Sequence, residues 1–359
     1  MKPSHGTFAW KKVVENKLFF PFIALALILL FDLIFIPGFF RIETRAGNLY
    51  GSPIDILRNG SYVMLLAIGM TLVIATGGVD LSVGAVMAIA ASVAAILINP
   101  TIIGVRLPPD VMQLVFNPNF TYTPLWEVIL VTLIVSIICG LWNGVLVSYG
   151  KIQPMVATLI LMIAGRGIAQ LITNAMRIQI FFEPYAFIGK GWIILPFSLY
   201  IVAFIYVVAW FLTRKTSIGM FIESVGINSR SSFFSGIDEK KIKLLVYAFC
   251  GFCAGVAGLV ASSNIQTSDA NNIGLNLELD AILAVVIGGT LLGAGGRFSL
   301  LASIIGALVI QATTTSMYAI GVPASAVIAV KALVVIFVIL LYSKQVRGFV
   351  RRITGQKEA

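Results

Sequence analysis

The chain has 359 residues, of which 59% are hydrophobic and only 11% are charged, and its mean hydropathy is +0.99. Soluble domains carry roughly 25% charged residues, so this composition excludes an ordinary soluble protein and indicates a membrane protein in contact with lipid. The net charge of +10 does not indicate a nucleic-acid partner. The Lys and Arg residues lie at the ends of apolar runs, and no basic patch with interleaved aromatic residues is present.

Apolar runs of about 20 residues recur along the chain, and each has the length of a membrane-crossing helix. We predict an all-α polytopic membrane protein, a single transmembrane domain over 1–359 with about ten helices, some of them broken. The first run is not followed by a cleavage site of small residues, so we expect a retained span rather than a signal peptide. The predicted spans are 18–35, 60–75, 81–98, 125–148, 155–173, 193–212, 246–262, 277–292, 298–318 and 324–342.

The distribution of positive charge predicts the orientation of these spans. With ten spans, most Lys and Arg residues fall in the N-terminal tail 1–17, in the charged segment 213–243 and in the basic tail 343–359. Cytoplasmic segments of multi-pass proteins carry the excess of positive charge, so we expect all three segments, and both termini, to be cytoplasmic. The segment 99–124 is rich in Pro and Asn and nearly free of cations, which is typical of an external loop.

The chain is interrupted most clearly between two apolar runs, at Thr76-Gly-Gly-Val-Asp-Leu-Ser82. A backbone break at membrane depth is tolerated only where protein or a watery cavity covers it. A carboxylate there is expensive and indicates function, so we predict a pathway or helix junction built from Gly77, Gly78, Asp80 and Ser82. Asp80 is interpreted either as a pathway charge or as a structural cap of the broken helix.

Other polar side chains within the apolar spans are further pathway candidates, namely Asn143, Arg166, Gln170, Gln311 and Lys331. Asn143 and Gln311 are equally typical of hydrogen bonds between helices. Arg166 lies between two glycines in Ala164-Gly-Arg-Gly167, and we hypothesise that it pairs electrostatically with Asp80.

Motifs for catalysis or metal binding are missing from the sequence. There is no phosphate-binding loop with its Lys, and one His cannot form a zinc-protease motif. Cys250-Gly-Phe-Cys253 has no second cysteine pair, so we interpret both thiols as small helix-packing residues, as we do Gly140, Gly144, Gly251, Gly255 and Gly258. We expect no catalytic residues, no metal and no cofactor.

The segment 218–236 combines apolar and polar residues in the charged stretch. It predicts a short helix that ends near Gly226, a second element from Asn228 to Ser235, and a stop at Gly236. Met220, Phe221, Phe233 and Phe234 lie among polar residues, which favours a docking surface over a plain linker. Gly77-Gly78 and Gly295-Gly296 each end an apolar run, as paired interruptions in transporter halves do, although this match is short.

Three stretches carry a family resemblance: TLVIATGGVDLSVGAVMAI at 71–89, ESVGIN at 223–228 with SGI at 235–237, and LAVVIGG at 283–289. They resemble the inner-membrane permeases of bacterial sugar ABC importers, the ribose, arabinose and galactose group. Further stretches, among them AGRG at 164–167 and DANN at 269–272, are most similar to permeases of the galactofuranose importers of enteric bacteria.

The resemblance implies a permease subunit that passes a monosaccharide, galactofuranose or a related sugar, into the cytoplasm and leaves ATP hydrolysis to a separate chain. It implies three partners: an ABC ATPase subunit, a second permease subunit that is a sister chain or a second copy, and a periplasmic sugar-binding protein. Coupling to the ATPase would involve Glu223, Gly226, Asn228, Ser235 and Gly236, and the periplasmic face would include Asp269, Asn271 and Asn272.

A second class of function is compatible with the residues alone. In an ion-coupled secondary transporter, Asp32, Asp80, Arg166 and Lys331 would form a proton or sodium relay. Uptake that depends on ATP and survives an uncoupler would exclude this alternative.

Overall fold

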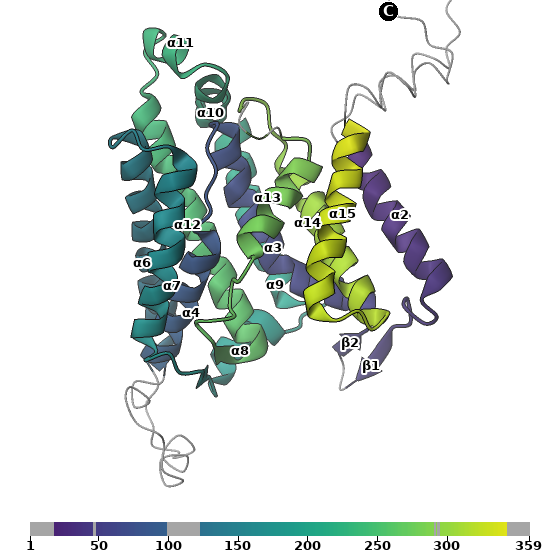
Figure 1. The fold of residues 1–359 in the computed structure, drawn as a ribbon. Helices are drawn as coiled ribbons and strands as arrows, with labels where there is room; N and C mark the ends of the chain where they lie inside the picture. Colours follow the sequence, from purple (N-terminus) through teal and green to yellow (C-terminus); the bar gives the residue numbers. More distant parts are fainter. Residues whose placement is uncertain (1–17, 46–47, 99–122, 291, 293–294, 343–359) are drawn as a thin grey trace, which may run out of the picture.

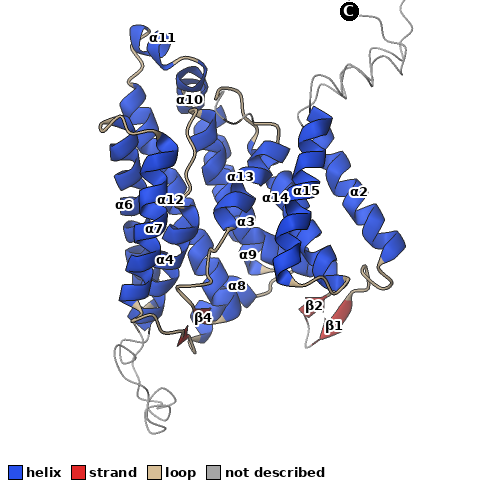
Figure 2. Cartoon of the chain, viewed as in Figure 1, coloured by secondary structure: helices blue, strands red, loops and turns tan. Residues whose placement is uncertain are grey.

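The computed structural model describes residues 18–45, 48–98, 123–290, 292 and 295–342, and these residues form a helical bundle (Figure 1). Short strand pairs lie near one end of the bundle (Figure 2). The helices are α2 (Phe19–Phe35), α3 (Ser52–Ala75), α4 (Val83–Ile98), α6 (Leu125–Ser148), α7 (Pro154–Ile172), α8 (Glu183–Lys190), α9 (Phe197–Arg214), α10 (Ile218–Ile227), α11 (Ser229–Phe234), α12 (Glu239–Ile265), α13 (Leu277–Ile287), α14 (Leu300–Ala319) and α15 (Ala324–Tyr342).

Six of the described helices are long and apolar enough to cross a membrane: α3, α6, α7, α9, α12 and α14. Shorter apolar helices accompany them, and many large apolar side chains on α2, α6, α7 and α9 face outward, as a lipid environment requires. The prediction of a polytopic helical membrane protein is therefore confirmed. The count of ten spans and the side on which the termini lie stay predictions, and the tails 1–17 and 343–359 lie outside the described residues.

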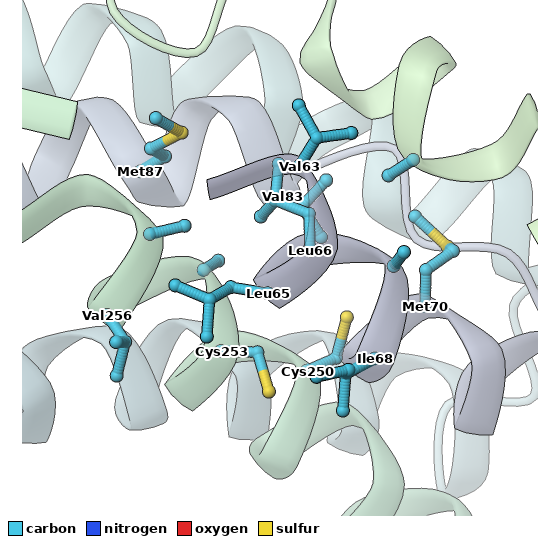
Figure 3. Packing of buried hydrophobic residues seen from close by; sticks show 14 of the residues in the cluster. Val63, Leu65, Leu66, Ile68, Met70, Val83, Met87, Cys250, Cys253 and Val256 are labelled. Atoms are coloured by element: carbon cyan, nitrogen blue, oxygen red, sulfur yellow. The ribbon is translucent and has the colours of Figure 1, made fainter. Parts of the chain in front are cut away.

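The centre of the bundle is α3, which is buried from Val63 to Ala75 and packs against α12 (Figure 3). Gly69 of α3 leaves room for the thiol-bearing residues of α12, since a Cβ on Gly69 would lie 3.0 Å from the Cβ of Cys253. Cys250 and Cys253 are buried free thiols at this contact. Their interpretation as helix-packing residues agrees with this geometry.

Small residues also bring α6 and α12 together. A Cβ on Gly140 would lie 3.0 Å from the Cα of Gly251, and one on Gly255 would lie 2.6 Å from the Cβ of Ser136. Lipid supplies no hydrophobic drive for helix association, so close packing of this kind stabilises the pair through dispersion contacts. The glycines predicted to permit close helix approach do so.

Two short helices begin inside the bundle. The 16 residues of α4 and the 11 of α13 are about 24 and 16 Å long, less than the roughly 30 Å of a bilayer core. The segment 76–82, called here the break, precedes α4, and the segment 266–276, called here the inner loop, precedes α13 (Figure 1). The start of α4 lies against the inner loop and α13, since a Cβ on Gly84 would collide with the carbonyl oxygen of Gly274 and with the side chain of Glu278.

The structure corrects several predicted boundaries. The span predicted over 60–75 begins earlier, since α3 starts at Ser52, and the residues before it hold an antiparallel pair, β1 (Glu43–Arg45) with β2 (Asn48–Tyr50). Pro53 stands in the first turn of α3, and an Arg58–Asp55 hydrogen bond of 3.0 Å stabilises its polar start. The span predicted over 277–292 ends as a helix at Ile287, because Gly289 has a φ of +80°.

A second short pair joins distant parts of the chain. Strand β3 (Ile178–Gln179) pairs antiparallel with β4 (Thr267–Ser268), at the beginning of the inner loop. The expectation of an all-α chain therefore omitted two strand pairs, both too short to be read from periodicity. The predicted external loop 99–124 lies almost entirely outside the described residues.

Candidate functional site

The break begins where α3 ends. Gly77 has a φ of +82°, a conformation that disfavours side chains, and it turns the chain away from the helix axis. Gly78 follows against α12, where a Cβ would lie 2.6 Å from the hydroxyl of Tyr247. Both glycines predicted at this junction are therefore needed by the backbone path.

Asp80 caps the start of α4. Its Oδ1 accepts hydrogen bonds from the Ser82 backbone N–H at 2.9 Å and from the Ser82 hydroxyl at 2.6 Å, directly before α4 begins at Val83. The exposed fraction of Asp80 is 1%, and among the described residues it forms no ion pair. The unpaired amides at the start of α4 carry partial positive charge, so they offset part of the cost of burying this carboxyl group.

Three other helices cover the break with neutral donors and acceptors. Asn143 of α6 donates from Nδ2 to the Ser82 hydroxyl at 2.8 Å and to Asp80 Oδ1 at 3.4 Å. Thr158 of α7 accepts the Leu81 N–H at 3.1 Å, and Tyr247 of α12 donates to the Val79 carbonyl at 3.3 Å. The break, which joins α3 to α4, is thus hydrogen-bonded to three further helices, as protein-covered backbone at membrane depth must be.

An unpaired acceptor remains in this junction. Asn143 is fully buried, and its Oδ1 has no hydrogen-bond partner among the described residues. A buried amide oxygen of this kind is costly unless a hydroxyl or a water reaches it. The chemistry available at the break is therefore hydrogen bonding to neutral groups.

Arg166 does not pair with Asp80, so that hypothesis was wrong. Its Nη1 donates to the carbonyl oxygens of Ala270 at 3.0 Å and Ile273 at 2.5 Å, both in the inner loop. On α7 the arginine lies eight residues beyond Thr158, which is about 12 Å along the helix from the contact with the break. Neutral donors already form hydrogen bonds to the Asp80 carboxylate, in the position that a cationic partner would occupy.

The inner loop is held by charged and amide side chains at the end of the bundle that carries α8. Arg177 donates to Asp269 Oδ2 at 2.8 Å, Asn272 donates to the same oxygen at 2.8 Å, and Gln170 donates to Asn271 at 2.6 Å. Burial by itself would raise the pKa of Asp269. The hydrogen bonds from Asn272, Arg177 and the amides of 271 and 272 outweigh burial and hold this pKa below its usual value.

The segment α10–α11 has the predicted form. Helix α10 ends at Ile227, the Asn228 side chain caps α11 by accepting the Ser231 N–H at 3.0 Å, and Gly236 has a φ of +82° after the last turn. Large apolar side chains are exposed there, with exposed fractions of 60% for Met220, 70% for Ile227, 67% for Phe233 and 83% for Phe234. Phe221 and Glu223 are half-buried.

An open cleft connects this segment with the break. It has a volume of about 370 Å³, and its lining residues are Thr76, Gly77, Gly78, Val147, Pro154, Val225, Gly226, Ile227, Asn228, Ser229, Lys243 and Tyr247. Gly77 and Gly78, predicted for the junction, thus line the same cleft as Gly226 and Asn228, predicted for coupling.

The remaining polar candidates lie elsewhere. Gln311 of α14 donates to Thr315 at 3.4 Å and packs near Gly60 of α3, away from the break. Lys331 forms a 2.7 Å ion pair with Asp280, a pairing that no local pattern indicated. Asp32 is fully buried on α2, and its carboxylate has no hydrogen-bond partner among the described residues.

These placements separate the four residues of the hypothetical ion relay. No hydrogen bond or ion pair joins any two of Asp32, Asp80, Arg166 and Lys331 in the described part of the chain. Across the same residues, no group of three or more His, Cys, Asp or Glu is arranged to hold a metal ion.

Sequence reasoning missed Tyr247, Thr158 and Gly84. The sequence contained one usable signal, because Tyr247 is the single tyrosine in an apolar run rich in glycine. Thr158 looks like any helix threonine, and Gly84 like any packing glycine. Their roles depend on partners more than 70 residues away.

Comparison with known proteins identifies the family of this bundle. Residues 52–342 match the family described as "Branched-chain amino acid transport system / permease component". The chain belongs to this permease family. The permease is 46% identical to the galactofuranose transporter permease protein YtfT of Escherichia coli (strain K12), with 93% of this chain and 92% of that protein covered.

Other relatives are also sugar permeases by name. The permease is 37% identical to the fructose import permease protein FruF of Bifidobacterium longum (strain NCC 2705), with 94% and 91% of the two chains covered. It is 32% identical to the ribose import permease protein RbsC of Escherichia coli (strain K12), with 86% and 88% covered. No solved structure matches the chain.

Proposed function

We propose that this chain is the membrane subunit of an ATP-driven importer that passes a neutral monosaccharide into the cytoplasm. The observation that carries the proposal is the placement of α10, whose exposed apolar surface adjoins a cleft that opens on the break in the bundle. A chain without a phosphate-binding loop needs a separate energy source, and an exposed surface of this kind fits a soluble ATPase subunit.

The sugar class is supported by the relatives and by the chemistry of the break. The relatives cited above are named for galactofuranose, fructose and ribose, and the first of them is 46% identical over 93% of this chain. Sugars are recognised mainly through hydroxyl hydrogen bonds, which amide and hydroxyl side chains supply. We assign galactofuranose or a related monosaccharide as substrate, with Asn143 and Ser82 at the pathway and Gly77, Gly78 and Asp80 as the helix junction.

The arrangement in the membrane follows from the same proposal. The chain lies in the bacterial inner membrane with about ten spans and with both termini cytoplasmic, and Glu223, Gly226, Asn228, Ser235 and Gly236 belong to the segment that meets the ATPase. A second permease, either a sister chain or another copy, completes the pathway. A periplasmic sugar-binding protein docks on the face that includes Asp269, Asn271 and Asn272.

Reconstitution in proteoliposomes tests this function. The permease, copurified with its ATPase chain, is expected to take up labelled galactofuranose only with enclosed ATP and with the binding protein outside, and an uncoupler should leave the rate unchanged. Uptake that needs no ATP and stops with the uncoupler would contradict the proposal and favour ion coupling.

Surface variants locate the ATPase contact. Phe233→Ser with Phe234→Ser changes two exposed side chains, so the bundle should fold while the copurifying ATPase falls at least tenfold. Ile194→Ser is the matched control, because Ile194 is 78% exposed and lies in the link between α8 and α9, and α8 is at the opposite end of the bundle from α11 (Figure 1). Equal ATPase recovery with the double variant and the control would remove α11 from the interface.

A further inference from the structure

The end of α10 makes an unusually close backbone contact with the end of α3. Gly226 is the penultimate residue of α10, and a Cβ there would collide with the carbonyl oxygen of Ala75, the last residue of α3. The two backbones touch with no side chain between them. Only glycine at 226 permits this approach.

A third backbone segment meets them at the same point. A Cβ on Gly295 would lie 2.7 Å from the Cα of Gly226, and the Gly296 N–H donates to the Ala75 carbonyl at 2.8 Å. Ala75, Gly226, Gly295 and Gly296 therefore form what we call the three-backbone junction. It joins α10, the end of α3 and the segment that precedes α14.

Two of the three segments are connected along the chain to the two short helices. Ala75 is followed directly by the break and α4, while the chain that leaves α13 at Ile287 passes through Gly295 and Gly296 before α14. The start of α4 also contacts the inner loop, at Gly84 and Gly274. A displacement of α10 at Gly226 is thus applied to both interrupted regions of the bundle.

We infer that Gly226 is a positioning residue through which α10 moves the break and the Gly295-Gly296 stretch together, so that one docking event shifts the chain next to both short helices. This inference rests on the proposed function, since it takes the bound ATPase as the source of the displacement. Backbone contacts this close have no flexible side chain to absorb a movement, and packed interiors transmit strain. The adjoining cleft of about 370 Å³ leaves space for the movement on one side.

Reporter cysteines measure the shared movement. Val79→Cys reports on the break and Leu292→Cys on the segment after α13, each in the full complex in proteoliposomes, with background measured on the parental chain and its three cysteines. ATP is expected to change the rate of maleimide labelling at both positions at least threefold. A response at only one of the two positions would overturn the inference.

Gly226→Ala tests the role of the junction itself. The ATPase should still copurify, because the exposed side chains of α10 and α11 are unchanged, while both labelling responses disappear and uptake falls at least tenfold. Gly167→Ala is the matched control, since a Cβ on that helix glycine would meet no atom within 4 Å. Retained labelling responses and uptake within twofold of the parental chain would overturn the inference.

A gentler variant covers the case in which Gly226→Ala does not fold. Val225 is 1% exposed and lines the cleft, so Val225→Ala loosens the end of α10 without a backbone collision. We expect both labelling responses to shrink together and uptake to fall about threefold, and unchanged responses would overturn the inference. If instead no ATPase copurifies with the parental chain, the proposed function fails before the junction is tested.

Discussion

The break and the inner loop are held in place by different kinds of side chain. Each is an irregular segment that precedes a short helix inside the bundle. The break is held by neutral groups from α6, α7 and α12, and its one carboxyl group, Asp80, is 1% exposed and caps α4. The inner loop is held by two arginines, and the side chain of Arg177 is 66% exposed.

This difference follows from access to water. A charge deep in the bundle needs a partner or hydrogen bonds from fixed dipoles, whereas a charge near the end keeps part of its hydration. We therefore expect the break to respond to changes in volume and hydrogen bonding, and the inner loop to respond to charge and pH.

The largest effect is expected where the two regions touch. Gly84→Ala places a Cβ on the carbonyl of Gly274 and near the Glu278 carboxylate, and neither backbone can retreat easily. Overpacking of this kind costs about 3 kcal/mol, so the melting temperature in detergent and the uptake rate should both fall sharply. Gly167→Ala, whose Cβ would meet no atom within 4 Å, should leave the melting temperature and the uptake rate unchanged. If the two variants behave equally, the close contact between Gly84 and Gly274 is contradicted.

Loss of the interhelical amide at the break should have the next largest effect. Asn143→Leu removes the donor to Ser82 and leaves that hydroxyl and Asp80 with fewer partners, at a cost of about 1–2 kcal/mol. Thr132→Val is the control on the same helix, because the Thr132 hydroxyl has no hydrogen-bond partner among the described residues. If thermal unfolding ranks the two variants equally, the Asn143 network contributes no stability.

Arg166 should affect the inner loop alone. Arg166→Gln loses donors to Ala270 and Ile273, so amide hydrogen exchange should accelerate severalfold over 269–276 while 76–82 keeps its protection. Lys151→Gln, at the other end of the bundle, serves as the control. The effects of Arg166→Gln and Asp80→Asn should add to within about 0.5 kcal/mol, and a larger coupling would restore the rejected ion pair.

A smaller, pH-dependent effect is expected at Asp269. Its pKa is lower in the folded chain than in the unfolded chain, where it is about 3.9, so the ionised group stabilises the loop above that pH. This stability is lost as the pH falls through the folded pKa, and nothing changes between pH 5 and 8. In the parental chain, the protection of 269–276 from hydrogen exchange should fall as the pH drops through the pKa of folded Asp269. In Asp269→Asn this pH-dependent loss of protection should be absent.

Much of the bundle could be predicted because long apolar runs and glycine pairs are local signals. The start of α3 could not, since Ser52, Asp55 and Arg58 give its first turns the polarity of a loop, and the Arg58–Asp55 contact that stabilises them is not evident from the pattern. The end of α13 at Ile287 escaped prediction because the apolar run continues to Leu292 although the glycines at 288 and 289 stop the helix.

The partners of the site were harder to predict than its centre. A Gly-Gly interruption with a carboxyl group locates the break, but the residues that satisfy it come from three helices far along the chain. An isolated Arg and an isolated Asp in apolar spans suggest each other as partners. In this structure Arg166 is paired with backbone carbonyls and Asp80 with neutral donors, and sequence spacing carries no information about such partners.

The most direct test of this account concerns Asp80, because a neutral, hydrogen-bonded break needs the shape of that side chain and not its charge. Asp80→Asn keeps an oxygen for Ser82 and Asn143, so the importer should retain uptake within twofold of the parental rate, with the same pH profile from 6 to 8. Asp80→Ala, which removes the cap, should lower the melting temperature and cost about 1 kcal/mol. An Asp80→Asn importer that assembles fully but no longer transports would contradict the account and return the charge to the mechanism.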